Sequence, residues 1–101
     1  MTSKQKKQPA VIIQSIYKRN GTIVSFNIDK ITQAVFKAMV HAGEGSFEET
    51  KKVTDRVYKD VLKITKKHKN FIPTVEGIQD TVERSLILGK YIKTAKAYIL
   101  Y

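Results

Sequence analysis

Three basic side chains in the first third of the chain could together bind an anion. Lys18 and Arg19 stand side by side just before a predicted Asn-Gly turn, and Lys30 lies in the first turn of a helix predicted to begin after Asn27. The N-terminus of a helix carries roughly half a positive charge, so a lysine there is unfavourable unless an anion lies close by. Because the second strand after the turn runs directly into this helix, the three cations can converge beside free backbone N–H groups. This arrangement predicts a phosphate site that suits a di- or triphosphate better than a single carboxylate.

The same residues also allow a plainer interpretation, in which the Lys-Arg pair is only the solvated tip of a tight turn. A second basic group, the lysine-rich segment at 51–67, is interrupted by Asp55 and Asp60 and lacks the aromatic residues that a base-stacking surface requires. We interpret that segment as a solvated helix face and do not expect nucleic-acid binding. Because there is no Walker lysine loop, no G-x-G-x-x-G run and no nucleophile elbow, we predict a non-catalytic chain.

Composition limits the class of protein and the charge of its partner. The chain has 101 residues, enough for one domain, and its net charge of +10 predicts an anionic partner, which could be a polynucleotide, a membrane surface or a small phosphate ester. Cysteine is absent and only two histidines occur, so no metal site is expected in the protein itself. No apolar run approaches the ~18 residues of a membrane span and no signal peptide is recognisable, so we expect a cytoplasmic protein without a membrane partner.

Residues 13–26 are predicted to form a β-hairpin. The Asn-Gly pair at 20–21 favours a two-residue type I′ turn. In that register Tyr17 faces Val24 while Ile16 points to the opposite side, so apolar and polar side chains are mixed on both faces. Such mixing is expected of a lid between a core and a ligand, although an edge hairpin half covered by a helix has the same pattern.

Four helical segments follow the hairpin. They are expected from about 28 to Gly43, from the Ser46–Glu49 capping box to the FIPT segment at 71–74, from Thr74 to Gly89, and from Tyr91 onward. In the last segment we expect Ile92, Ala95 and Ile99 to pack inward. Phe71 and Ile72 could form a short third strand. We therefore predict an α+β fold, with a β-hairpin or small three-stranded sheet as a lid over a bundle of about four helices.

Three separated motifs resemble a known family. The segment YKRNGTIVSFNIDKITQAV at 17–35 resembles the signature of the ATP-cone, in which a basic turn joins two strands and a helix opens with Asn followed by Lys-Ile. The segment IPTVEGIQDTVERSLI at 72–87 resembles the third helix of that family, and TAKAYILY at 94–101 resembles its closing helix. The resemblance covers about residues 13–101 as one ATP-cone domain, preceded by a basic tail at 1–12 that we expect to be disordered.

The resemblance implies a regulatory rather than a catalytic role. ATP-cones typically lie at the N-terminus of ribonucleotide reductase catalytic subunits, where ATP or dATP switches the enzyme on or off through changes in subunit assembly. The implied effector is therefore ATP or dATP with Mg²⁺, and the implied partners are the catalytic domain or subunits of the reductase, with formation of homo-oligomers. A bacterial repressor of reductase genes also carries this domain, but there a cysteine-rich zinc ribbon precedes it. This chain has no cysteine, which favours the reductase context.

The resemblance also implies a set of nucleotide-binding residues. In chain order these are Ile16, Lys18, Arg19, Asn27, Lys30, Thr74, Val75 and Gln79. The charged and polar members around the hairpin and first helix would bind phosphate and sugar, whereas Ile16 would press on the adenine. On the third helix, Thr74 or Val75 followed by Gln79 occupies the region where the family contacts the base, often through threonine and then histidine or aspartate. Val24 stands where some relatives carry an acidic residue.

Two other functions stay open at this point. A DNA-binding or repressor-type module of nucleotide-reductase genes would use the lysines at 51–67 and the tail. A small phosphotransferase would need a base or nucleophile, and none is evident in the sequence.

Overall fold

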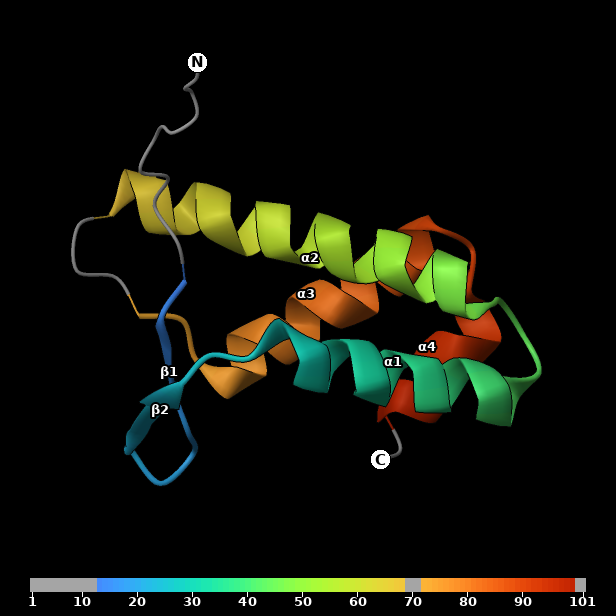
Figure 1. Cartoon of the computed structure of the whole chain (residues 1–101), viewed down its shortest axis with the longest axis horizontal. Helices are drawn as coiled ribbons and strands as arrows, with labels where there is room; N and C mark the ends of the chain where they lie inside the picture. The colour runs from blue at the N-terminus through green and yellow to red at the C-terminus, as the bar shows by residue number, and fades with distance from the viewer. Residues whose placement is uncertain (1–12, 69–71, 100–101) are drawn as a thin grey trace, which may run out of the picture.

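Two short strands and four helices make up residues 13–68 and 72–99, the part of the chain that the computed structural model describes. They are β1 (Ser15–Tyr17), β2 (Ile23–Ser25), α1 (Ile28–Ala42), α2 (Phe47–Lys67), α3 (Val75–Leu88) and α4 (Ile92–Ile99). The hairpin lies at one end of the bundle, beside the first turns of α1 and α3 (Figure 1). The predicted α+β class is confirmed, and the predicted tail at 1–12 lies outside the described residues.

The hairpin register differs by one residue from the predicted one. Ile16 pairs with Val24, because the loop spans three residues instead of two. The Gly21 N–H donates to the Lys18 carbonyl over 2.9 Å, and the Lys18 N–H donates to the Thr22 carbonyl over 2.8 Å. Gly21 has a φ of +85°, a left-handed conformation that glycine adopts without strain and that ends three-residue hairpin loops. The expectation of a two-residue type I′ turn was therefore wrong.

This register gives the hairpin an inner and an outer face. Directly opposed residues of an antiparallel pair point to the same side, so Ile16 and Val24 share the face that looks toward the bundle. Tyr17 and Ile23 form the outer pair, and both are exposed. Since a shift of one residue exchanges the face on which a side chain lies, the register decides which side chains can meet a ligand.

The predicted third strand, at Phe71 and Ile72, does not occur among the residues that the structure describes. Phe71 itself lies outside the described residues. The segment at 72–74 instead runs beside β1 through a single parallel bridge between Tyr17 and Thr74. In this bridge the Tyr17 N–H donates to the Pro73 carbonyl over 2.9 Å. Pro73 has no N–H with which to continue a ladder, which explains why no strand forms there. The bridge still positions the start of α3 against the hairpin.

The helix ends follow the predicted capping residues. The side chains of Asn27, Ser46 and Thr74 each accept a hydrogen bond from a backbone N–H of the following turn, over 2.9, 3.2 and 2.9 Å respectively. The C-terminus of α1 is closed by Gly43, which has a φ of +67°. These caps determine where α1 and α3 begin, and both helices begin at the hairpin.

The helices pack around one apolar core. Both α1 and α3 contact α2 and α4. The core residues are Ile13, Val35, Met39, Val53, Val57, Val61, Ile78, Val82, Leu86 and Ala95. Tyr58 attaches the hairpin to α2, since its ring lies 6.0 Å from that of Phe26 and its hydroxyl accepts a hydrogen bond from the Ile13 N–H over 3.4 Å. No helix in the described part of the chain is long and apolar enough to cross a membrane.

The prediction for the inward face of α4 was wrong in two of its three residues. Ala95 is buried, but Ile92 and Ile99 are 52% and 55% exposed. Thr94 and Ala97 are buried in their place. A short helix that approaches its neighbours through small side chains can lie close to them, so the larger isoleucines are left outside.

Two carboxylates hold α4 against the rest of the bundle. Glu44, in the loop between α1 and α2, accepts hydrogen bonds from the backbone N–H and the hydroxyl of Thr94 over 2.8 and 2.9 Å. Glu49 accepts a hydrogen bond from the Tyr91 hydroxyl, and this bond raises the pKa of Tyr91. A raised pKa in the folded state means that the stability from this bond is present below the ordinary tyrosine pKa and is lost as pH rises through the raised value.

Substituting Glu44→Ala should lower the free energy of unfolding by about 1–2 kcal/mol, because the fully buried Thr94 then loses the acceptor for two donors. Urea denaturation followed by circular dichroism measures the change. Glu44→Gln is the matched control, since its amide oxygen can still accept both bonds and most of the stability should remain. Equal losses in the two variants would contradict this role for Glu44.

Candidate functional site

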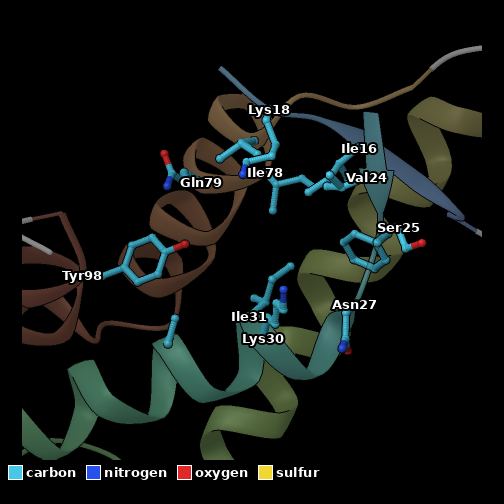
Figure 2. Close-up of a pocket in the computed structure, with 13 residues that line it drawn as sticks. Ile16, Lys18, Val24, Ser25, Asn27, Lys30, Ile31, Ile78, Gln79 and Tyr98 are labelled. Carbon is cyan, nitrogen blue, oxygen red and sulfur yellow. The ribbon is translucent and has the colours of Figure 1, made fainter. Parts of the chain in front are cut away.

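A cavity of about 480 Å³ lies between the inner face of the hairpin and the first turns of α1 and α3. Its volume is within the range of roughly 300–1,000 Å³ that is usual for small-molecule sites. Most of the wall is apolar, formed by Ile16, Val24, Phe26, Ile31, Val75 and Ile78. Figure 2 shows the hairpin on one side of the cavity, α3 on the other side and α1 below. Such a wall can accept a flat hydrophobic ring.

Two lysines bring positive charge to this apolar cavity. Lys18 follows β1 and Lys30 lies in the first turn of α1, and both line the cavity. They approach from opposite sides, Lys18 from the hairpin and Lys30 from the helix (Figure 2). Among the described residues of the lining there is no carboxylate, so none of them neutralises either ammonium group within the cavity. The combination of an apolar wall and two cations favours a ligand that has both a ring and an anionic group.

Two uncharged polar side chains complete the edge toward α4. Gln79 lines the cavity from α3, and Tyr98 lines it from α4 with its hydroxyl directed toward the interior (Figure 2). Burial raises the pKa of Tyr98, so the phenol stays protonated and can donate a hydrogen bond. Within the described residues this hydroxyl has no hydrogen-bond partner. It is therefore available to a ligand.

The structure brings most of the predicted site residues to this cavity. Those that line it are Ile16, Lys18, Asn27, Lys30, Val75 and Gln79. Arg19 does not, because its guanidinium Nε lies 3.0 Å from a carboxylate oxygen of Glu76. Thr74 also lies outside the lining, and its hydroxyl caps α3 by accepting from the Gly77 N–H.

The start of α1 offers fewer free N–H groups than the sequence suggested. The Asn27 side chain accepts from the Asp29 N–H over 2.9 Å, and the Asn27 carbonyl accepts from the Lys30 N–H over 3.1 Å. Asn27 therefore uses its side-chain oxygen for the helix and keeps its NH₂ group as a donor. The donors for an anion in this cavity are mainly side chains, with the two lysines foremost.

Sequence reasoning missed several residues that line the cavity. Val24 and Phe26 were missed because the predicted register placed them on the other face of the hairpin from Ile16. The three-residue loop brings all three side chains to the same face. Ile31 follows Lys30 directly and could have been inferred from that neighbour. Tyr98 had no local signal, since only the packing of α4 brings it to the hairpin end.

A second hollow of about 400 Å³ adjoins the cavity. It shares Lys30, Gln79 and Tyr98 with the cavity and adds Gln33 and Lys37 from the same face of α1. Positive charge thus continues along α1 beyond the first cavity. Within residues 13–68 and 72–99, no group of three or more acidic or histidine side chains is placed to hold a metal ion.

Comparison with known proteins identifies the family. Residues 14–101 match the model of the ATP cone domain, which is nearly the whole chain. The chain belongs to the ATP-cone family. The hairpin and the starts of α1 and α3, which enclose the cavity, all lie within the matched region, so the family expected from the three motifs is confirmed.

Two relatives of this ATP-cone are ribonucleoside-diphosphate reductases. The chain is 37% identical over 95 residues to the vitamin B12-dependent ribonucleoside-diphosphate reductase of Thermoplasma acidophilum, with 89% of the chain and 12% of that protein covered. It is 33% identical over 104 residues to the ribonucleoside-diphosphate reductase subunit alpha of Chlamydia pneumoniae, with 86% of the chain and 9% of that protein covered. The chain thus spans about a tenth of the length of these curated relatives.

Proposed function

We propose that this ATP-cone is a regulatory domain of a ribonucleotide reductase, that it binds ATP or dATP in the cavity at the hairpin, and that it is not itself catalytic. The observation that carries the proposal is the cavity in which Lys18 and Lys30 face an apolar wall, with no carboxylate among the lining residues that the structure describes. The similarity to two reductases supports the regulatory context.

In this proposal the adenine binds to the apolar wall of the cavity and the phosphates bind to its lysines. The adenine would lie against the aliphatic side chains of the hairpin and α3, and the Gln79 amide, which has both donors and an acceptor, would bond to its edge. The phosphates would lie between Lys18 and Lys30. Each charge-assisted hydrogen bond to a phosphate is worth about 1.5–3 kcal/mol.

A triphosphate normally carries Mg²⁺, which its phosphate oxygens and water hold with few protein ligands. Within residues 13–68 and 72–99 no carboxylate lines the cavity, which fits an ion that enters with the nucleotide. Asn27 and the lysines would then contact the sugar and those phosphate oxygens that the ion leaves free.

ATP and dATP differ only in the 2′-hydroxyl, so binding alone should separate them modestly. A buried polar partner for that hydroxyl is worth about 1 kcal/mol net. The regulatory difference would therefore lie in which assembly each nucleotide stabilises, with the reductase catalytic subunits or with further copies of the chain. A nucleotide can shift that assembly only as far as its affinities for the two states differ.

The alternative of a DNA-binding module receives no support from the comparisons. Its lysine-rich surface, the exposed face of α2, lies on the side of the helix opposite its buried residues, as solvated charges do. The cavity, by contrast, combines positive charge with an apolar wall, and its volume is large enough for a nucleotide.

Thermal shift with ATP, dATP, GTP and a short DNA duplex at two salt concentrations tests the proposal. ATP and dATP should raise the melting temperature. They should retain much of this effect at high salt, because salt screens the contacts with the lysines but not the packing of the adenine against the apolar wall. GTP should have a smaller effect. A shift caused only by the duplex, and lost steeply as salt rises, would instead favour the DNA-binding module.

A further inference from the structure

Arg19 is held at the edge of the cavity by an acidic residue of α3. Its Nε lies 3.0 Å from the Glu76 carboxylate, and the two side chains are 74% and 49% exposed. Each partner directly follows a residue that lines the cavity, Lys18 in the case of Arg19 and Val75 in the case of Glu76. The ion pair therefore spans the rim between the hairpin loop and α3.

The surroundings of Arg19 are acidic as well. With Asp80 and Glu83 of α3, Arg19 lines a separate hollow of about 230 Å³, which shares Gln79 and Tyr98 with the cavity. Glu76, Asp80 and Glu83 are spaced by four and then three residues, so they lie on one face of the helix. Arg19 is thus directed toward a carboxylate-bearing face of α3 rather than toward the two lysines.

We propose that Glu76 competes with the nucleotide for Arg19, an inference that rests on the proposed function. In the empty domain Glu76 holds the guanidinium outside the cavity. When a triphosphate binds beside Lys18, its β- and γ-phosphates accept the guanidinium in place of the carboxylate. An exposed Arg–carboxylate contact is weak, whereas a phosphate carries more charge and accepts a guanidinium bidentately, so the exchange is favourable.

The exchange links cavity occupancy to the outer surface of the domain. Once Arg19 moves to the phosphates, Glu76 is left uncompensated, and the acidic face of α3 becomes more negative. A partner that senses the charge of this face would then respond to the bound triphosphate, and by reciprocity its binding would alter nucleotide affinity.

Isothermal titration of the full 101-residue chain with ATP and AMP tests the competition. Glu76→Gln should tighten ATP binding by about two- to fivefold, which lies within the range that the energy of an exposed ion pair allows. AMP, which lacks the β- and γ-phosphates, should change less. Asp55→Asn is the control for net charge, because Asp55 is an exposed residue of α2 that lines neither the cavity nor the hollow beside Arg19, and the ATP affinity of this variant should stay at the wild-type value.

The Arg19→Ala background separates competition from a general charge effect. Arg19→Ala should weaken ATP binding, and adding Glu76→Gln to it should then produce no gain. A gain that persists in this background, or an equal gain from Asp55→Asn, would overturn the proposal. If the unmodified chain binds ATP but Glu76→Gln leaves the affinity unchanged, the competition alone is refuted. If the unmodified chain binds no ATP, the proposed function fails and the competition fails with it.

Discussion

Alanine in place of Lys30 should weaken ATP binding by roughly ten- to a hundredfold, the loss that corresponds to one charge-assisted hydrogen bond to phosphate. The empty domain should fold as before, and its free energy of unfolding should stay the same or rise by a few tenths of a kcal/mol. The reason is that Lys30 is exposed and lies in the first turn of α1, where its charge opposes the helix dipole. Titration calorimetry measures the affinity, and urea denaturation measures the stability.

Lys30→Arg and Lys59→Ala are the controls for this effect. The first keeps the positive charge and should retain part of the affinity, although the geometry of its guanidinium differs. The second removes an exposed lysine from α2, outside the cavity lining, and should leave ATP binding nearly unchanged. If Lys30→Ala binds ATP as tightly as the wild type, the phosphates do not lie at this end of α1. If the empty variant unfolds, Lys30 has a structural role.

Leu86→Ala should lower the free energy of unfolding by about 3–5 kcal/mol, the largest effect on stability that we expect from a single substitution in this domain. Leu86 is fully buried in α3 and belongs to the core on which all four helices pack. Its truncation removes apolar contacts and leaves a cavity that the helices can close only in part. Since small domains have a total stability of only about 5–15 kcal/mol, much of the variant could be unfolded at 37 °C.

Leu88→Ala offers a control of the same chemistry in the same helix. Leu88 is 64% exposed, so its truncation should change stability by no more than about 0.5 kcal/mol. Comparable losses in the two variants would mean that α3 does not present Leu86 to the core. At a temperature where Leu86→Ala remains folded, ATP affinity should be close to normal, because Leu86 does not line the cavity.

Local features of the chain were predictable because they depend on residues a few positions apart. The caps at Asn27, Ser46 and Thr74 and the left-handed Gly43 all follow from backbone N–H groups and carbonyls that must be bonded at helix ends. The apolar stripe of α3, with Ile78 and Leu86 buried, follows from helical spacing. The family was recognisable for the same reason, since its motifs are continuous segments.

The prediction failed where the outcome depends on neighbours distant in sequence. The Asn-Gly pair is compatible with both a two-residue and a three-residue loop, and the observed register is the one that turns Ile16 and Val24 toward the bundle together. The prediction of a third strand was wrong because Pro73 has no N–H for a second ladder bond, and a single bridge to β1 forms instead. Hydrophobicity did not predict which face of α4 is buried, because the close approach of this helix to its neighbours buries its small residues and leaves the isoleucines exposed.

The sequence by itself determined that this chain has a basic hairpin joined directly to a helix start, with cations at both, because the chemistry of turns and caps is local. Only the tertiary structure decided which of these cations share a cavity. It directs Lys18 and Lys30 inward, pairs Arg19 with Glu76 at the rim, and brings Tyr98 of α4 to the opposite edge. The physical reason is that side-chain direction depends on strand register and helix packing, which involve contacts across the whole chain.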